Sequence, residues 1–140
     1  INYLDSYEYQ VAPGDRIVDA TGTLDQGGLY EIRMLNTFSY SWNNVFLGLG
    51  WRYLSDIKSA AASLTPNTTI QGTDSYSVYS VNASYEWEKL ALRMGIDNLL
   101  DEEPRVIGAN PGIDSNTDTT LPAFYDAIGR SFYVGLTMSF

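Results

Sequence analysis

Apolar and polar side chains alternate at the end of the chain. The apolar ones are Phe132, Val134, Leu136, Met138 and Phe140, and the positions between them carry serine, tyrosine, glycine and threonine. A period of two residues is the period of a β-strand, whose successive side chains point to opposite faces. The pattern therefore predicts a strand with one apolar and one polar face.

The same alternation occurs earlier in the chain. It runs through residues 30–42, 45–53, 79–87 and 90–97, and less regularly through residues 1–10. Together with the terminal stretch these segments predict six strands and no helix. Asp5 and Asn36 fall on the apolar faces, so either a bulge shifts the register locally or these positions lie outside the apolar layer.

The connections between the predicted strands alternate between short and long. Residues 42–44 and 86–89 form the short ones, and residues 11–29, 54–75 and 98–125 form the long ones. Connections longer than about 12–15 residues are uncommon in compact soluble domains. Short periplasmic turns alternating with longer extracellular loops are typical of outer-membrane β-barrels.

The apolar faces either contact lipid or pack against a second sheet, as in a soluble β-sandwich. Aromatic side chains gather near the ends of the apolar rows, at Tyr40, Trp42, Trp51, Tyr53, Tyr85 and Trp87. Such positions match the aromatic girdles at the two interfaces of a transmembrane barrel. The distribution favours an all-β, transmembrane antiparallel β-barrel, with the soluble sandwich binding module as the alternative.

The opposite faces carry glycines and charged residues, which suit a water-filled or plugged lumen. The charged candidates for this lumen are Glu31, Arg33, Arg52, Arg93 and Asp97. They either line a substrate path or contact a plug domain through charge pairs. Because single-chain bacterial barrels have about eight strands or more, we expect residues 1–140 to be the last six strands of a larger barrel, of the class with about 22 strands.

Composition excludes several kinds of chemistry. The chain has 8 Lys and Arg residues against 17 Asp and Glu residues, a net charge of -9, which argues against nucleic acid as a partner. Histidine and cysteine are both absent. Thiolate or imidazole metal sites and Ser-His or Cys-His catalysis are therefore excluded, and we expect no enzyme, cofactor or metal, although paired carboxylates remain possible in principle.

Two stretches, "GIDNLLDEEPRVIG" and "YDAIGRSFYVGLTMSF", carry a family resemblance. They resemble the C-terminal end of TonB-dependent outer-membrane receptors, with Leu100 standing where an aromatic residue is commoner. The matching residues are Asn98, Leu99, Asp101, Pro104, Tyr125, Asp126, Gly129, Arg130 and Phe140. The match covers about 45 residues, and the remainder of the chain agrees in strand rhythm only.

The resemblance implies a function and a set of partners. It implies TonB-energised uptake of a scarce ligand, such as a siderophore or an oligosaccharide, across the bacterial outer membrane, with the long loops extracellular and the C-terminus periplasmic. The implied partners are outer-membrane lipid and lipopolysaccharide, the N-terminal plug and earlier barrel strands, the TonB complex and the barrel-assembly machinery. The terminal strand ending in Phe140 resembles the signal that the barrel-assembly machinery recognises. The alternative function is that of a passive porin-type diffusion barrel.

Polar residues in the last long connection have simpler interpretations. Asp114, Asn116 and Asp118 resemble the first ligands of a calcium loop, but the rest of the loop pattern is missing, so we expect a solvated loop. We expect Asn98 and Asp101 to order the exit from the preceding strand, and Asp126 to pair with Arg130 at the entry to the last one.

Overall fold

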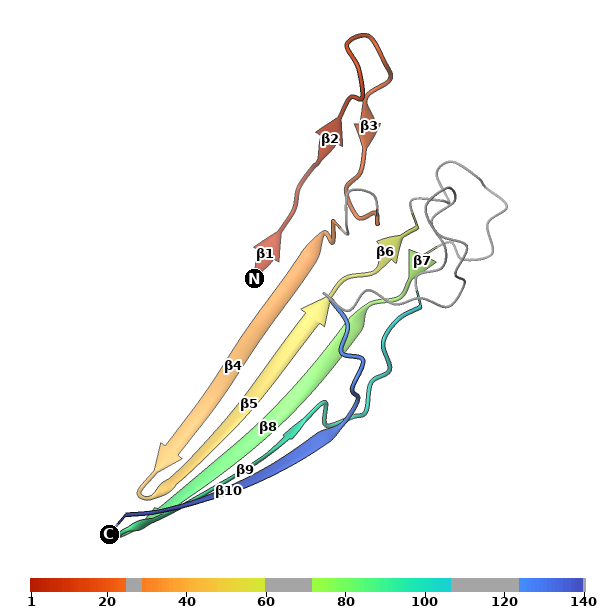
Figure 1. The fold of residues 1–140 in the computed structure, drawn as a ribbon. Coiled ribbons are helices and arrows are strands. Elements are labelled where there is room, and N and C mark those ends of the chain that lie inside the picture. Colours follow the sequence, from red (N-terminus) through yellow and green to blue (C-terminus); the bar gives the residue numbers. More distant parts are fainter. Residues whose placement is uncertain (25–28, 60–71, 107–123, 140) are drawn as a thin grey trace. The chain divides into compact units, whose positions relative to one another are not determined.

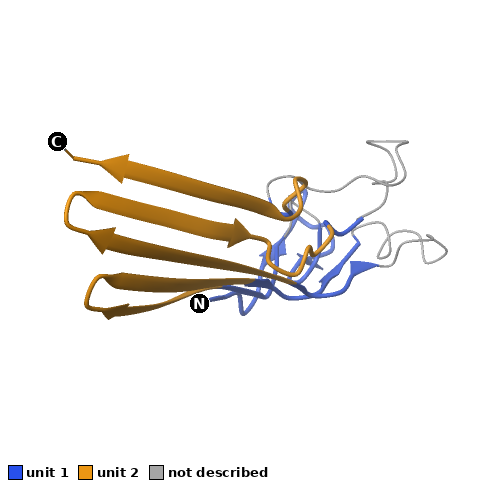
Figure 2. Cartoon of the chain, turned by 90° about the horizontal axis from the view of Figure 1, so that it is seen from below, with its two compact units in different colours: residues 1–34, 53–76, 104–125 blue, residues 35–52, 77–103, 126–140 orange. Residues whose placement is uncertain are grey.

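The computed structural model describes residues 1–24, 29–59, 72–106 and 124–139, and this part of the chain is all β. The chain divides into two compact units (Figure 2). Unit 1 comprises Ile1–Met34, Tyr53–Tyr76 and Pro104–Tyr125, and unit 2 comprises Leu35–Arg52, Ser77–Glu103 and Asp126–Phe140. Among the described residues, no helix is long and apolar enough to span a bilayer.

Six strands form one antiparallel sheet in the order β1-β4-β5-β8-β9-β10 (Figure 1). Their bounds are β1 Asn2–Tyr3, β4 Ile32–Trp42, β5 Val45–Leu54, β8 Tyr76–Trp87, β9 Leu90–Asp97 and β10 Ser131–Met138. Within this sheet, each strand lies beside the strands that precede and follow it along the chain. The predicted all-β class and the predicted antiparallel sheet of six strands are confirmed.

The prediction of a single strand over residues 1–10 is wrong. β1 is followed by a separate strand, β2 (Glu8–Tyr9), which pairs with β3 (Val18–Asp19). The amide of Tyr7 donates to Thr21 Oγ1 at 2.7 Å, so the chain here pairs with its own returning connection instead of continuing along the sheet. Asp5 lies between the two strands, outside both, which removes the register fault predicted there.

The long connections also contain more strand than the sequence predicts. Besides β3 in the first, the second includes β6 (Ile57–Lys58), which pairs with β7 (Gly72–Thr73). These two-residue strands are too short for a period of two to be recognised in the sequence. In contrast, β4 runs without interruption through Asn36, the second predicted register fault.

Two-residue turns join β4 to β5 and β8 to β9, as the short connections predict. Asn43 and Glu88, the first residues of these turns, have φ values of 49° and 48°. Asparagine tolerates this left-handed conformation better than most residues, whereas glutamate adopts it less readily. Because so short a turn fixes the pairing of its flanking residues, Trp87 lies directly opposite Leu90.

The register in unit 2 places apolar side chains of β9 directly opposite apolar side chains of β8 and β10. Met94 of β9 lies opposite Ala83 on one side and Val134 on the other, and Leu92 lies opposite Tyr85 and Leu136. This apolar face is exposed: 48% of the Leu47 surface, 66% of Leu136 and 75% of Val134 are accessible. The prediction of one apolar face shared by adjacent strands is therefore confirmed for β8, β9 and β10.

Two glycines on the polar face of unit 2 receive side chains from the neighbouring strand. A Cβ atom added to Gly95 would lie 2.3 Å from Cζ of Tyr133, which stands directly opposite on β10. A Cβ at Gly48 would similarly lie 2.7 Å from Oδ1 of Asn82. The Tyr133 ring therefore covers Gly95, an arrangement in which an aromatic side chain compensates for glycine in a strand.

The buried centre of unit 1 is a cluster of aromatic side chains. Tyr30, Tyr76 and Tyr125 are at most 3% exposed. The Tyr30 hydroxyl donates to the Tyr125 hydroxyl at 2.8 Å, and the rings of Tyr76 and Tyr125 meet edge to face with centroids 4.9 Å apart. The Thr73 and Tyr125 hydroxyls are 3.3 Å apart. Hydrogen bonding with the Tyr125 hydroxyl allows the Tyr30 hydroxyl to be buried at little cost.

We predict that Gly95→Ala destabilises the protein by about 1–3 kcal/mol, because the new methyl group displaces the Tyr133 ring. Urea unfolding of the folded protein measures this loss. Gly135→Ala is the matched control, since nothing lies within 4 Å of a Cβ at that position. In a Tyr133→Ala background the cost of Gly95→Ala should largely disappear; an unchanged cost would contradict the contact.

The second prediction concerns the ionisation of Tyr30. Burial, and then the hydrogen bond with Tyr125, raise the pKa of Tyr30 well above its ordinary value. Because the folded-state pKa exceeds the unfolded one, this contribution to stability is complete below about pH 10 and is lost as the pH rises through the folded-state pKa. In a titration followed by tyrosinate absorbance, Tyr30→Phe should remove one late-ionising group. Early ionisation of Tyr30 would contradict the cluster.

Candidate functional site

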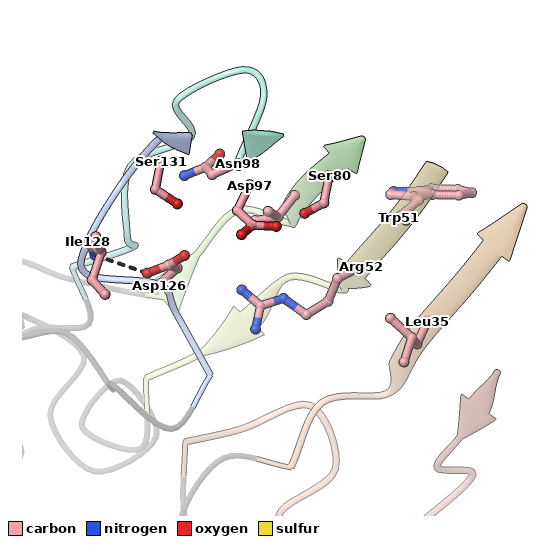
Figure 3. Close-up of a pocket in the computed structure, with 11 residues that line it drawn as sticks. Leu35, Trp51, Arg52, Ser80, Asp97, Asn98, Asp126, Ile128 and Ser131 are labelled. Carbon is pink, nitrogen blue, oxygen red and sulfur yellow. Dashed lines mark hydrogen bonds between the residues drawn. The ribbon is translucent and has the colours of Figure 1, made fainter. Parts of the chain in front are cut away.

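Unit 2 contains a concavity of about 380 Å³ where the polar face of the sheet meets the β9–β10 connection (Figure 3). Its volume falls within the range of small-molecule sites. The lining residues are Leu35, Gly50, Trp51, Arg52, Val78, Ser80, Asp97, Asn98, Asp126, Ile128 and Ser131. They come from β4, β5, β8, β9, the start of β10 and the preceding connection.

One guanidinium and two carboxylates supply the charge of this concavity. Arg52 extends from β5, Asp97 ends β9, and Asp126 lies in the β9–β10 connection. Figure 3 labels all three among the residues that line the concavity. The hydroxyls of Ser80 and Ser131 add groups that both donate and accept. The site can therefore hold a polar solute through charge-assisted and neutral hydrogen bonds.

Strand alternation explains how distant residues reach one site. Arg52 and Asp97 occupy polar-face positions on their strands, and Ser131 lies directly opposite Asp97 in the β9–β10 ladder. The Asp126 carboxylate is held by a local turn, in which its Oδ1 accepts the amide of Ile128 at 2.9 Å. Among the described residues, no group of three or more acidic side chains is placed to hold a metal ion.

The structure brings together two of the five predicted lumen residues, Arg52 and Asp97. Arg93 lies further along β9, opposite Ser84 and Gly135, and does not line the concavity. Glu31 and Arg33 belong to unit 1, where the Arg33 guanidinium lies 5.9 Å from the centre of the Phe124 ring. The sequence did not predict four further lining residues, because residues that meet through the sheet leave no local signal in the sequence. They are Leu35, Ser80, Ile128 and Ser131. Asp126 was predicted as a motif residue and as the partner of Arg130, not as part of this concavity.

Asn98 orders the exit from β9. Its side chain is fully buried, with Oδ1 accepting the amide of Glu102 at 2.8 Å and Nδ2 donating to the Glu102 carbonyl at 2.9 Å. Its own φ is 52°, a conformation that asparagine tolerates. The next residue, Leu99, donates its amide to the Tyr79 carbonyl of β8 at 2.7 Å. The predicted ordering role of Asn98 is confirmed.

The predicted pairing of Asp126 with Arg130 is wrong. Arg130 pairs with Asp101 instead: its amide donates to Asp101 Oδ1 at 2.9 Å, and its Nη2 lies 3.7 Å from Oδ2. The Asp126 carboxylate is occupied by the Ile128 amide two residues later. The motif thus contains a contact between residues 29 positions apart in the sequence, through which Asp101 orders the entry to β10.

Tyr125, another motif residue, belongs to the aromatic cluster of unit 1, and Pro104 is half-buried in the same unit. Gly129 has a φ of 77° and lies against the Asp101 carboxylate. Asp114, Asn116, Asp118 and Phe140 lie outside the described residues.

The predicted aromatic girdle residues divide between the two ends of the strands. Tyr40, Trp42, Tyr85 and Trp87 lie next to the two-residue turns and are exposed. Trp51, near the opposite end of β5, stacks on Tyr79 with ring centroids 6.0 Å apart, and Tyr53 follows it in the strand. Leu47, Val81, Ala83 and other aliphatic side chains occupy the same face between the two groups.

We predict that Asn98→Asp destabilises the protein by about 1–3 kcal/mol, because it replaces an amide donor with a carboxylate oxygen facing the Glu102 carbonyl. Asn43→Asp is the matched control, since Asn43 also has a positive φ but is exposed. Urea unfolding should separate the two variants; equal stabilities would contradict a role for the buried amide.

Comparison with known proteins gives no relative: no family model, no curated protein and no solved structure matches the chain.

Proposed function

We propose that this chain is the C-terminal part of the β-barrel of a TonB-dependent transporter in a bacterial outer membrane. Its work is ligand binding and gated, energy-coupled uptake, with no bond chemistry. The energy enters through a plug and a TonB-binding segment that belong to other parts of the same protein.

The exposed apolar face of unit 2 carries this proposal. Its aliphatic side chains lie in register across β8, β9 and β10, and large ones such as Val134 and Leu136 are more than half exposed. Soluble monomers rarely expose contiguous apolar patches of this kind without a partner to cover them. A bilayer covers such a face along its whole length.

Strand length supports the same proposal. β4, β5 and β8 contain 11, 10 and 12 residues. A tilted strand needs about 9–11 residues to cross the hydrocarbon core. β9 and β10 are shorter, with 8 residues each, but their apolar rows end near the same groups of aromatic residues. The two aromatic groups correspond to the interfacial girdles of a transmembrane barrel.

The orientation follows from the connections. The two short turns, Asn43–Asn44 and Glu88–Lys89, lie at the same end of the sheet as the end of β10. The Ser139 amide donates to the Lys89 carbonyl at 2.8 Å, and the Glu86 amide donates to the Asn44 carbonyl at 2.9 Å. In this proposal that end is periplasmic and the long connections are extracellular. β10 is an edge strand of the sheet, which suits its proposed use as the assembly signal through strand addition.

The concavity around Arg52, Asp97 and Asp126 faces the lumen in this orientation. We place it on the ligand path or against the plug, where its opposite charges form hydrogen bonds with a polar partner. Binding of the purified periplasmic domain of TonB by the intact protein, in a pull-down, distinguishes the proposal from a passive porin, which has no segment for TonB.

We predict that nitroxide labels at adjacent residues of one strand lie in different environments, one in lipid and the other in water. The chain has no cysteine, so a nitroxide can be attached to single cysteines in the intact protein in lipid. Labels at Leu92→Cys and Leu136→Cys should be accessible to oxygen and protected from a polar nickel complex. Labels at Arg93→Cys and Thr137→Cys, the matched controls, should show the reverse.

Equal access of the nickel complex to Leu92→Cys and Arg93→Cys would contradict a lipid-facing sheet. So would a protein that stays monomeric and folded in buffer without detergent.

A further inference from the structure

The connection between β9 and β10 is closed at its base by a clasp of three residues, Asp101, Gly129 and Arg130. Asp101 accepts the Arg130 amide at 2.9 Å and lies 3.7 Å from its guanidinium, which also donates to the Leu99 carbonyl at 3.4 Å. A Cβ added to Gly129 would lie 3.2 Å from Asp101 Oδ1, so the carboxylate rests against the glycine. The clasp joins residues at the two ends of a long connection.

The clasp lies directly beside the first pair of the β9–β10 ladder. Arg130 immediately precedes Ser131, which is opposite Asp97. On the other side, Asp101 is tied to the preceding strands: its amide donates to the Asn98 carbonyl at 2.9 Å, and the Leu99 amide donates to Tyr79 of β8. The clasp therefore holds Arg130, the residue before β10, at a fixed place relative to β8 and β9.

Side-chain alternation alone does not fix the register of β10. A slip of one residue would turn Phe132 and Val134 to the polar face and is disfavoured. A slip of two residues keeps every apolar side chain on the apolar face. The β4–β5 and β8–β9 hairpins avoid this error because two-residue turns fix their register, whereas a long connection leaves it open.

We propose that the Asp101–Gly129–Arg130 clasp sets the register of the terminal strand against β9. Arg130 can reach Asp101 only when Ser131 pairs with Asp97, and a two-residue slip breaks both of its contacts. The clasp thus positions β10 in one register against β9. This inference concerns strand pairing and does not depend on the proposed transport function.

The test uses disulfide formation between β9 and β10 in the intact protein. Val134 lies opposite Met94 in the observed register, whereas slips of two residues would place it opposite Leu92 or Ile96. Three double-cysteine proteins, pairing Val134→Cys with Met94→Cys, Leu92→Cys or Ile96→Cys, therefore report the three registers. With Asp101 present, we expect the 94–134 disulfide to predominate after oxidation with copper phenanthroline.

Asp101→Ala should raise the ratio of slipped to native disulfides by about tenfold, as expected for loss of one charge-assisted hydrogen bond. Asp126→Ala is the matched control, because it removes another carboxylate of the same connection, and the hydrogen bond that this carboxylate makes within the described residues is local, to the Ile128 amide. Asp101→Asn keeps an oxygen acceptor for the Arg130 amide and should give an intermediate ratio. If Asp101→Ala fails to assemble, Asp101→Asn supplies the measurement.

The contact between Tyr133 and Gly95 also depends on register, so each variant is repeated with Tyr133→Ala. There, Asp101→Ala should produce still more slipped product. Exclusive formation of the native disulfide by Asp101→Ala or Asp101→Asn in this background would overturn the proposal. Equal slipping in Asp126→Ala and Asp101→Ala would overturn it as well.

Discussion

The residue-by-residue antiparallel ladder through β8, β9 and β10 is the interaction on which the properties of unit 2 depend. Each pair in this ladder commits two side chains to the same face, so Leu92, Met94 and their partners form one apolar surface. The same pairs direct Asp97 and Ser131 to the opposite face, where the concavity lies. A single constraint, the period of two, thus produces both a surface suited to hydrocarbon and a polar site.

Residues at the two ends of the long connections hold the adjoining strand ends in place. In unit 2, the exit from β9 is fixed by the buried Asn98 and the entry to β10 by the Asp101–Arg130 contact. In unit 1, Tyr30, Tyr76 and Tyr125 bring together segments that are far apart in the sequence. Both arrangements use buried or charge-assisted hydrogen bonds to hold the strand ends in place.

The sequence predicted what depends on periodicity and missed what depends on long-range contacts. The five long strands of the sheet, the two short turns and the apolar face follow from alternation, because side-chain direction is set locally. The β2–β3 and β6–β7 pairs were missed, since two residues carry no period. Asp126 was assigned to Arg130 because they are close in sequence, whereas the partner that reaches Arg130, Asp101, is 29 residues away. The concavity could not be assembled from sequence, because its residues meet only through the ladder.

The central claim is that hydrocarbon chains, and not a second layer of protein, cover the apolar face of β8, β9 and β10. Methyl-labelled leucine in the intact protein, reconstituted in lipid nanodiscs, tests it directly through intermolecular nuclear Overhauser effects. The account predicts cross-peaks from the methyl groups of Leu47, Leu92 and Leu136 to the acyl methylene protons of the lipid. Cross-peaks from these methyl groups to other protein side chains, with none to lipid, would contradict it.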